Sequence, residues 1–259
     1  MEQRSSNIAS VKRLQSLRDN PTAQVLIIGG GINGIATFRD LALQGVNVVL
    51  VEREDFCSGA SAASSHMIHG GVRYLENGEF RLVKESLQER NRLLASAPHY
   101  VKPLQTTMPI FTVFSGLLSA PMRILRHTQG KPQERGAVLI KVGLTLYDFF
   151  GRNGGRMSRH EFFGKKKSLK LFPELNKKVA FTATYYDAAM ESPERLALDT
   201  LKDGLATGSH ARAANYLSAV GMKDGGVVLR DSLSGQEFPF KAEVIINTSG
   251  PWTDLTNKT

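Results

Sequence analysis

The sequence has a single cysteine, Cys57, and no run of about eighteen apolar residues. A single thiol excludes a disulfide within these residues, which fits a reducing compartment. The lack of a long apolar run argues against a transmembrane helix. The first twenty residues have no apolar central region and so do not resemble a secretory signal. Hydrophobic residues still make up 41% of the chain, enough to build the core of an α/β domain.

Acidic residues are scarce in one segment, 121–180, which holds 14 of the 33 Lys and Arg residues but only 4 of the 24 Asp and Glu residues. Apolar stretches at 111–124 and 137–150 accompany this basic excess. Basic residues interleaved with apolar stretches favour contact of 111–180 with an anionic membrane surface. A solvated basic face is the alternative. Nucleic acid is not an expected partner, because no nucleic-acid-binding motif is present.

The N-terminal residues 1–20 carry apolar residues at every third position, which predicts a short amphipathic helix docked on the domain. Several basic residues suggest a transit peptide instead, but Glu2 and Asp19 argue against it. The apolar positions are Ile8, Val11, Leu14 and Leu17.

The segment 24–53 has the pattern of a nucleotide-binding βαβ unit. An apolar run at 25–28 predicts a buried parallel strand, and a second apolar strand at 46–51 ends at Glu52. Between them a helical stretch ends at Gly45 and places four residues on one face. These residues are Ile35, Phe38, Leu41 and Ala42.

Three glycines open that helix in the order G-x-G-x-x-G. Gly29 permits a tight turn, Gly31 lets a pyrophosphate approach the backbone, and Gly34 lets the helix pack closely on the strand. Glu52 can accept hydrogen bonds from an adenosine ribose, which argues against a 2′-phosphate. The motif alone does not distinguish NAD from FAD. The predicted dinucleotide contacts here are Gly29, Gly31, Ile32, Asn33, Gly34, Glu52 and Arg53.

The segment 55–76 begins with small polar residues and ends in a group of distinctive larger side chains. Its serines suit a chain that wraps a large cofactor, and it continues past what a nicotinamide site needs, which favours FAD. A flexible linker is the alternative, but the crowded residues His66, His69, Arg73 and Tyr74 are more than a linker requires. The pair His66 and His69 lacks further ligands, so a metal site is not expected. Cys57 has no partner base and is expected to fill a tight corner.

The remaining elements are assigned from periodicity and turn residues. Asn77 is predicted to cap a helix to about residue 97, buried through Phe80, Val83, Leu87 and Leu94. Ser192 and Pro193 open a helix that ends near 208. Strands are expected at 106–113, 179–186, 211–220, 227–229 and 242–247, with a turn at 224–226.

Three motifs carry a family resemblance: GGGINGIA after the first strand, SSHMIHGGVRYLENGEFRLVKESLQERNRLLASAPH from Ser64, and NTSGPW at 247–252. Together they resemble the FAD-dependent glycerol-3-phosphate dehydrogenases, from about Asn7 to the last residue. The stretch from Ser64 to Leu75 is the most family-specific part. One position departs from the pattern, since the family usually has lysine where this chain has His66.

The resemblance implies a glutathione-reductase-type α/β flavoprotein. It combines a Rossmann-like FAD-binding domain, with a parallel sheet, and an incomplete antiparallel-sheet substrate domain. We expect an N-terminal helix at 1–20, an FAD-binding domain at 21–105 and 188–259, and a substrate and membrane-facing region at 106–187. The family continues beyond residue 259, so we expect a fragment or truncated relative that holds FAD weakly and is inactive alone.

The resemblance also assigns residues. Arg73 would bind the substrate phosphate through its guanidinium, and Tyr74 would add a hydroxyl. His69 is the candidate base, because an imidazole titrates in the useful range, but it could instead orient the flavin. The further FAD contacts implied are Ser64, Ser65, His66, Ile68, His69, Gly70, Gly71, Ser249, Gly250, Pro251 and Trp252.

The implied reaction is oxidation of sn-glycerol 3-phosphate to dihydroxyacetone phosphate, with electrons passed to quinone. The expected location is the cytoplasm, at the inner face of the cytoplasmic membrane rather than in a mitochondrion, and a homodimer is left open. Two alternatives remain: another FAD-dependent amine or hydroxy-acid oxidase of the same fold, and a non-catalytic flavin-binding fragment.

Overall fold

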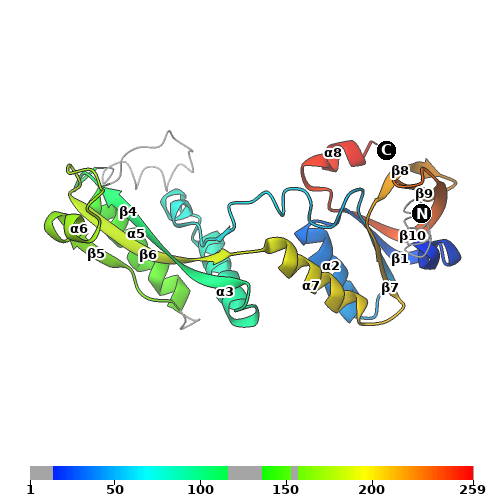
Figure 1. Cartoon of the computed structure of the whole chain (residues 1–259), viewed down its shortest axis with the longest axis horizontal. Helices are drawn as coiled ribbons and strands as arrows, with labels where there is room; N and C mark the ends of the chain where they lie inside the picture. Colours follow the sequence, from blue (N-terminus) through cyan, green and yellow to red (C-terminus); the bar gives the residue numbers. More distant parts are fainter. Residues whose placement is uncertain (1–13, 116–135, 153–156, 259) are drawn as a thin grey trace, which may run out of the picture. The chain divides into compact units, whose positions relative to one another are not determined.

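The computed structural model describes residues 14–115, 136–152 and 157–258 (Figure 1). The chain divides into two compact units, each described by itself below. The terminal unit comprises residues 1–65 and 192–259, and the middle unit comprises residues 66–191. Within the described residues, no helix has the length and apolar character needed to cross a membrane.

The terminal unit is built on a six-stranded sheet in the order β7-β2-β1-β10-β9-β8. β7, β2, β1 and the C-terminal part of β10 run parallel, whereas β10, β9 and β8 are antiparallel. Asp224 and Gly225, both with positive φ, form the predicted turn between β8 and β9. The strands are β1 (Thr22–Ile28), β2 (Val48–Val51), β7 (Ala211–Ala214), β8 (Leu217–Lys223), β9 (Gly226–Asp231) and β10 (Glu237–Asn247).

Helices cover this sheet. α2 (Ile32–Leu43) and α7 (Pro193–Leu205) lie side by side (Figure 1), and Phe38 of α2 packs closely against Gly204 of α7. Residues 14–19 are helical. Their Leu14 and Leu17 are buried in a hydrophobic cluster that also contains Phe240 of β10. The described part of the predicted N-terminal helix therefore packs into the core, while Ile8 and Val11 lie outside the described residues. The chain ends in η3 (Gly250–Trp252) and α8 (Thr253–Thr256).

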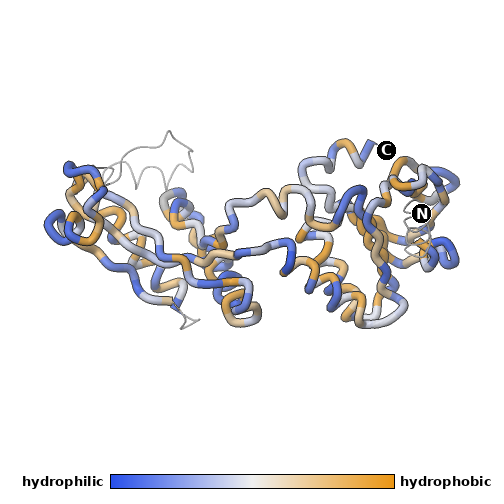
Figure 2. Tube along the Cα trace, viewed as in Figure 1, coloured by the Kyte–Doolittle hydropathy of each residue, from blue (hydrophilic) through white to orange (hydrophobic). Residues whose placement is uncertain are grey.

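The middle unit is built on an antiparallel sheet in the order β3-β6-β4, with β5 also pairing β6. Two helices, α3 and α5, cover one face, and hydrophobic residues run along much of α5 (Figure 2). The 3₁₀ helix η1 and the short helix α6 complete the unit. The elements are β3 (Met67–Ile68), η1 (Val72–Asn77), α3 (Phe80–Ser96), β4 (Val101–Ile110), α5 (Ala137–Gly151), β5 (Glu161–Gly164), α6 (Lys165–Leu171) and β6 (Phe181–Met190).

The prediction for α3 was wrong in two details. Asn77 is the last residue of η1 rather than a helix cap, because Gly78 in the left-handed region separates η1 from α3. Phe80 is exposed, and Arg90 takes its place among the buried residues of α3. The spacing Val83, Leu87, Arg90, Leu94 is a regular helical stripe, so periodicity could have located Arg90.

The packing boundaries at 65 and 191 also differ from the sequence-based boundaries at 105 and 188. Residues 66–105 belong to the middle unit because β4 pairs along the length of β6 and α3 packs on α5.

Candidate functional site

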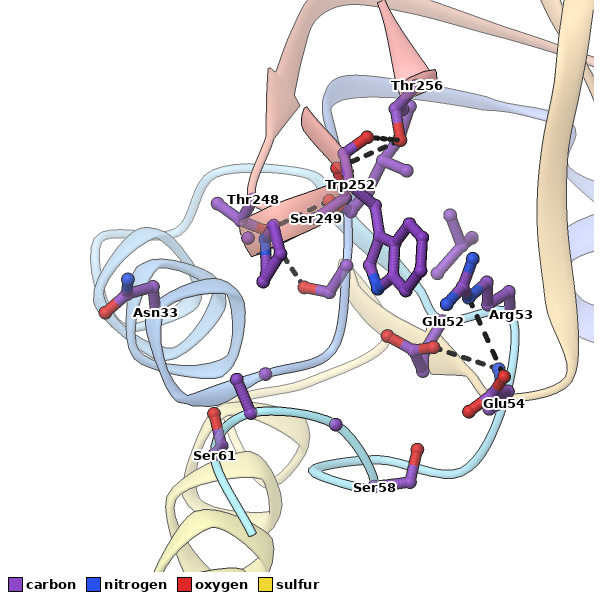
Figure 3. A pocket seen from close by; sticks show the side chains of 18 of the residues that line it. Asn33, Glu52, Arg53, Glu54, Ser58, Ser61, Thr248, Ser249, Trp252 and Thr256 are labelled. Carbon is purple, nitrogen blue, oxygen red and sulfur yellow. Dashed lines mark hydrogen bonds and ion pairs between the residues drawn. The ribbon is translucent and has the colours of Figure 1, made fainter. Parts of the chain in front are cut away.

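A cavity of about 460 Å³ lies at the carboxyl ends of the parallel strands of the terminal unit (Figure 3). In open α/β sheets this edge is the usual place for a ligand. Residues from four segments line the cavity: the turn after β1, the chain after β2, the start of β8, and the turn after β10.

The glycine turn after β1 is held by close backbone contacts. Gly29 has φ +112°, and a Cβ there would lie 2.6 Å from the carbonyl oxygen of Thr248. A Cβ on Gly34 would lie 1.9 Å from the carbonyl oxygen of Gly29. The positive φ of Gly29 suits the tight turn predicted there, and Gly34 packs closely against that turn. A Cβ on Gly31 would meet, among the described residues, only Ser61 Oγ at 3.2 Å, so this side of the turn is open.

The N-terminus of α2 borders the same cavity. The Ile32 N–H donates to Ser61 Oγ at 2.9 Å. The first N–H groups of a helix lack partners within the helix, and the helix dipole favours an anion there. Ile32, Asn33 and Ser61 all line the cavity, so the Ser-rich segment after β2 does reach the helix N-terminus.

Glu52, at the end of β2, uses its carboxylate within the turn. Oε2 accepts a hydrogen bond from the Gly30 N–H at 2.6 Å, and Oε1 accepts one from the Glu54 N–H at 2.9 Å. Glu52 is only half-buried and lines the cavity, as the sequence predicts. Since a carboxylate offers about four acceptor positions, it retains capacity for ribose hydroxyls.

Arg53 and Trp252 lie far apart in the sequence and meet at the cavity. The Arg53 guanidinium lies 4.7 Å from the centre of the Trp252 ring, a cation–π arrangement (Figure 3). Ser249, Gly250 and Pro251 line the cavity beside Trp252. The sequence predicted these residues individually but not their pairing.

Thr248 is a site residue that the sequence analysis missed. Its Oγ1 donates toward the carbonyl oxygens of Ile28 at 3.0 Å and Gly29 at 2.9 Å, which ties the end of β10 to the glycine turn. Its position directly before Ser-Gly-Pro at a strand end was the available signal. Ser58 and Ser61 line the cavity as well. Ser64 and Ser65 are exposed and are not among the described residues that line it.

Cys57 packs at the edge of this site as a small buried residue. Its N–H donates to the Gly30 carbonyl oxygen at 2.9 Å. Burial raises the pKa of the Cys57 thiol, against a lowering contribution from Ser61. A raised pKa disfavours the nucleophilic thiolate, which agrees with the corner-filling role predicted for Cys57.

The geometry of the terminal unit fits the adenosine-diphosphate half of a dinucleotide. The cavity volume lies within the range of about 300–1,000 Å³ that is common for ligand sites. An open glycine, a helix N-terminus and an accessible carboxylate at the next strand end supply contacts for a pyrophosphate and a ribose. Gly31, Ile32 and Ser61 would hold the phosphates, and Glu52 the ribose.

The middle unit has its own cavity, of about 900 Å³, lined mostly by apolar residues of η1, β4 and α5. The polar residues His69, Arg73 and Tyr74 line it together, so the structure brings the predicted base and substrate ligands to one place. Of the other predicted residues, Gly71 lines the cavity, Ile68 lies in β3, and Gly70 is buried. His66 accepts a backbone hydrogen bond from Met190 through its carbonyl oxygen, at 2.8 Å.

The sheet topology and the glycine site are those of a dinucleotide-binding fold. The chain belongs to the FAD-dependent oxidoreductase family, whose model matches residues 24–259. The fold class and the expected FAD cofactor are thereby confirmed.

Within this family the chain is similar to glycerol-3-phosphate dehydrogenases. It is 36% identical to the Synechocystis enzyme of that name over 91% of this chain and 40% of that protein. It is 31% identical to the mitochondrial mouse enzyme over 95% of this chain and 33% of that protein. The chain thus spans less than half the length of these relatives, and the resemblance noted in the sequence is confirmed.

Solved structures agree on the fold. A glycerol-3-phosphate dehydrogenase from Bacillus halodurans, in complex with FAD, matches 96% of this chain and 39% of its own, with a TM-score of 0.62 and 23% identity. An L-proline dehydrogenase from P. horikoshii matches 92% of this chain and 55% of its own, with a TM-score of 0.60 and 14% identity.

Proposed function

We propose that this chain forms the flavin site and part of the substrate site of an enzyme that oxidises sn-glycerol 3-phosphate to dihydroxyacetone phosphate. The observation that carries this proposal is the match to glycerol-3-phosphate dehydrogenases over more than nine-tenths of the chain. A flavin amine or hydroxy-acid oxidase shares the fold but has less support, because the relatives matched at 36% and 31% identity are glycerol-3-phosphate dehydrogenases.

The chemistry assigns roles to three polar residues that line the middle cavity: His69, Arg73 and Tyr74. The bound flavin supplies the acceptor for the two electrons and the hydrogen that leave C2. Arg73 binds the phosphate dianion, because a guanidinium offers paired N–H donors. Tyr74 donates a hydrogen bond from its hydroxyl to the substrate. His69 takes the proton of the C2 hydroxyl as the carbonyl forms.

Replacing Arg73 tests the substrate assignment. In the flavin-loaded protein, Arg73→Ala should raise the KM for glycerol 3-phosphate by about a hundredfold, because a charge-assisted hydrogen-bond pair is lost. Flavin content should stay unchanged. Arg92→Ala, at an exposed arginine on α3, is the control and should leave KM unchanged. If Arg73→Ala loses flavin while substrate affinity is kept, Arg73 belongs to the cofactor site.

The role of His69 is tested by His69→Gln. Loss of a base should lower kcat by about a hundredfold or more, with flavin content retained. If His69 instead orients the flavin, the variant should lose flavin or shift its visible spectrum before substrate is added.

We further propose that the middle unit contacts an anionic membrane surface and that electrons pass to quinone there. On α5, four exposed apolar residues follow a helical spacing, and two of them, Val142 and Leu146, also line the middle cavity; the four are Val138, Val142, Leu146 and Phe149. Exposed Lys165, Lys166 and Lys167 on α6 add positive charge in the same unit. Both features suit an anionic interface. Part of the predicted segment 111–180 lies outside the described residues, and location at the inner face of the cytoplasmic membrane remains part of this proposal.

Vesicle sedimentation tests the membrane proposal. The protein should sediment with anionic vesicles more than with neutral ones, and added salt should reduce but not abolish binding. Equal sedimentation with both vesicle types would remove the electrostatic part, and no sedimentation would favour a solvated basic face.

A further inference from the structure

A buried polar cluster in the middle unit links three elements to the glycine turn beside His69. The Arg90 Nη1 of α3 donates to Asp187 Oδ1 of β6 at 3.1 Å. The Tyr147 hydroxyl of α5 donates to the same oxygen at 2.5 Å. The Gly70 N–H in turn donates to the Tyr147 hydroxyl oxygen at 2.8 Å and lies 3.2 Å from Asp187 Oδ1.

The cluster is almost fully removed from solvent. The exposed fractions are 2% for Arg90, 2% for Asp187 and 3% for Tyr147. Arg90 also donates to the Tyr186 carbonyl oxygen at 3.0 Å. Burial, and then the Asp187 carboxylate, raise the pKa of Tyr147, so its hydroxyl stays protonated and can donate. Removing one partner of a buried, hydrogen-bonded charge pair costs much free energy.

The Gly70 end of the cluster is tightly confined. A Cβ on Gly70 would lie 2.4 Å from Leu87 Cδ2 and 2.5 Å from the Tyr147 hydroxyl oxygen. Gly71 has φ 68° and ψ 53°, in the left-handed region, and leads directly into η1. The conformation of this turn sets where His69 before it and Arg73 after it can point.

We propose that Arg90, Asp187 and Tyr147 are positioning residues: by holding the Gly70 N–H they fix the directions in which His69 and Arg73 face the middle cavity. This inference rests on the function proposed above. A purely structural cluster would close its hydrogen bonds among side chains and the surrounding core. Here Tyr147 and Asp187 instead meet at a backbone N–H adjacent to His69, and Asp187 itself borders the cavity that His69 and Arg73 line.

The test compares two variants that each remove one buried hydroxyl. Tyr147→Phe removes the nearer of the two acceptors of the Gly70 N–H and leaves Asp187 Oδ1, at 3.2 Å, as the other. Thr184→Val, on β6, removes a buried hydroxyl that forms a hydrogen bond with the Thr107 hydroxyl at 2.8 Å. In the part of the chain that the structure describes, this hydroxyl makes no hydrogen bond to Gly70. In the flavin-loaded protein, hydrogen–deuterium exchange of the peptide 66–75 is measured together with KM and kcat for glycerol 3-phosphate.

For Tyr147→Phe we expect exchange in 66–75 to be about three- to tenfold faster, the factor that corresponds to one ordinary hydrogen bond. KM should rise by about the same factor or more, with flavin content retained. Thr184→Val should change neither exchange in 66–75 nor KM. If Tyr147→Phe does not fold, Arg90→Lys keeps the charge, loses the guanidinium geometry, and should show smaller changes of the same sign.

Equal exchange in the two variants would overturn the proposal, and so would faster exchange in Tyr147→Phe with an unchanged KM. If the wild-type protein does not oxidise glycerol 3-phosphate at all, the proposed function fails. The exchange measurement then still decides whether the cluster holds the turn, because it needs no substrate.

Discussion

Two glycine turns, one in each unit, place a backbone N–H against a carboxylate, and they differ in what surrounds that carboxylate. In the terminal unit, the Gly30 N–H donates to Glu52 at 2.6 Å. In the middle unit, the Gly70 N–H lies 3.2 Å from Asp187. Both residues border a cavity, but Glu52 is half-buried, whereas Asp187 is buried and bonded to an arginine and a tyrosine.

The difference separates a carboxylate that accepts hydrogen bonds only from the backbone from one whose Oδ1 is also held by an arginine and a tyrosine. Glu52 accepts two backbone hydrogen bonds and keeps acceptor capacity for ribose hydroxyls. Asp187 Oδ1 is shared by Arg90, Tyr147 and Gly70. We infer that the first carboxylate serves binding and the second serves the shape of the site.

The largest expected effect removes the backbone packing that allows the first turn to form. Gly34→Ala would place a Cβ 1.9 Å from the Gly29 carbonyl oxygen, and backbone cannot yield as a side chain can. We expect a loss of at least about 3 kcal/mol in the free energy of unfolding, measured by urea denaturation, and loss of flavin.

Gly143→Ala is the matched control for Gly34→Ala. Gly143 lies inside α5, where a Cβ would meet nothing within 4 Å in the described residues, so alanine should be neutral or stabilise by up to about 1 kcal/mol. Similar stability of both variants would contradict the close packing of the first turn.

The next effect tests the buried carboxylate. Asp187→Asn leaves the Arg90 charge without its counter-charge, and breaking a buried pair costs about 3–5 kcal/mol. The exposed pair Lys102–Glu191 lies in the same unit, and Glu191→Gln should cost less than about 1 kcal/mol. Urea denaturation checks both variants, and a cost for Asp187→Asn as small as that of the control would remove the contrast between the two carboxylates.

The smallest effect on stability is expected at Glu52. Glu52→Gln keeps one acceptor oxygen but places an amide NH₂ group against a backbone N–H of the glycine turn. This should lower the free energy of unfolding by about 1–2 kcal/mol. Its effect on flavin should be larger, seen as faster release of FAD on dilution, because the amide binds ribose hydroxyls less well. Glu237→Gln, at an exposed residue of β10 that is not among the described residues lining the cavity, should release FAD at the wild-type rate. If both variants retain FAD equally, Glu52 is not a ribose ligand.

Local patterns account for the part of the fold that could be predicted. The strand, glycine turn, helix and second strand of 24–53 formed as expected, with Ile35, Phe38 and Ala42 buried. The contact between Gly34 and Gly29 spans one turn of chain, so the residue types at these positions are enough to indicate it. The Asp224-Gly225 hairpin was predictable for the same reason.

Longer-range relations were not predictable in this way. Arg53 and Trp252 meet although each was predicted as a separate contact, and Thr248 of the NTSGPW motif ties β10 to a glycine turn 220 positions away in the sequence. Arg90 follows the helical spacing of the buried residues of α3, but only the tertiary packing shows that its charge is paired with Asp187.

The amino-acid sequence by itself determined the nucleotide-binding βαβ unit, the family and the candidate residues, because turn geometry and hydrophobic periodicity depend on near neighbours. Only the tertiary structure decided how those residues are held. The cluster at Gly70 joins residues separated by 40, 77 and 97 positions. A buried charge is stable only where distant elements bring its partners together, and that condition is a property of the packed fold.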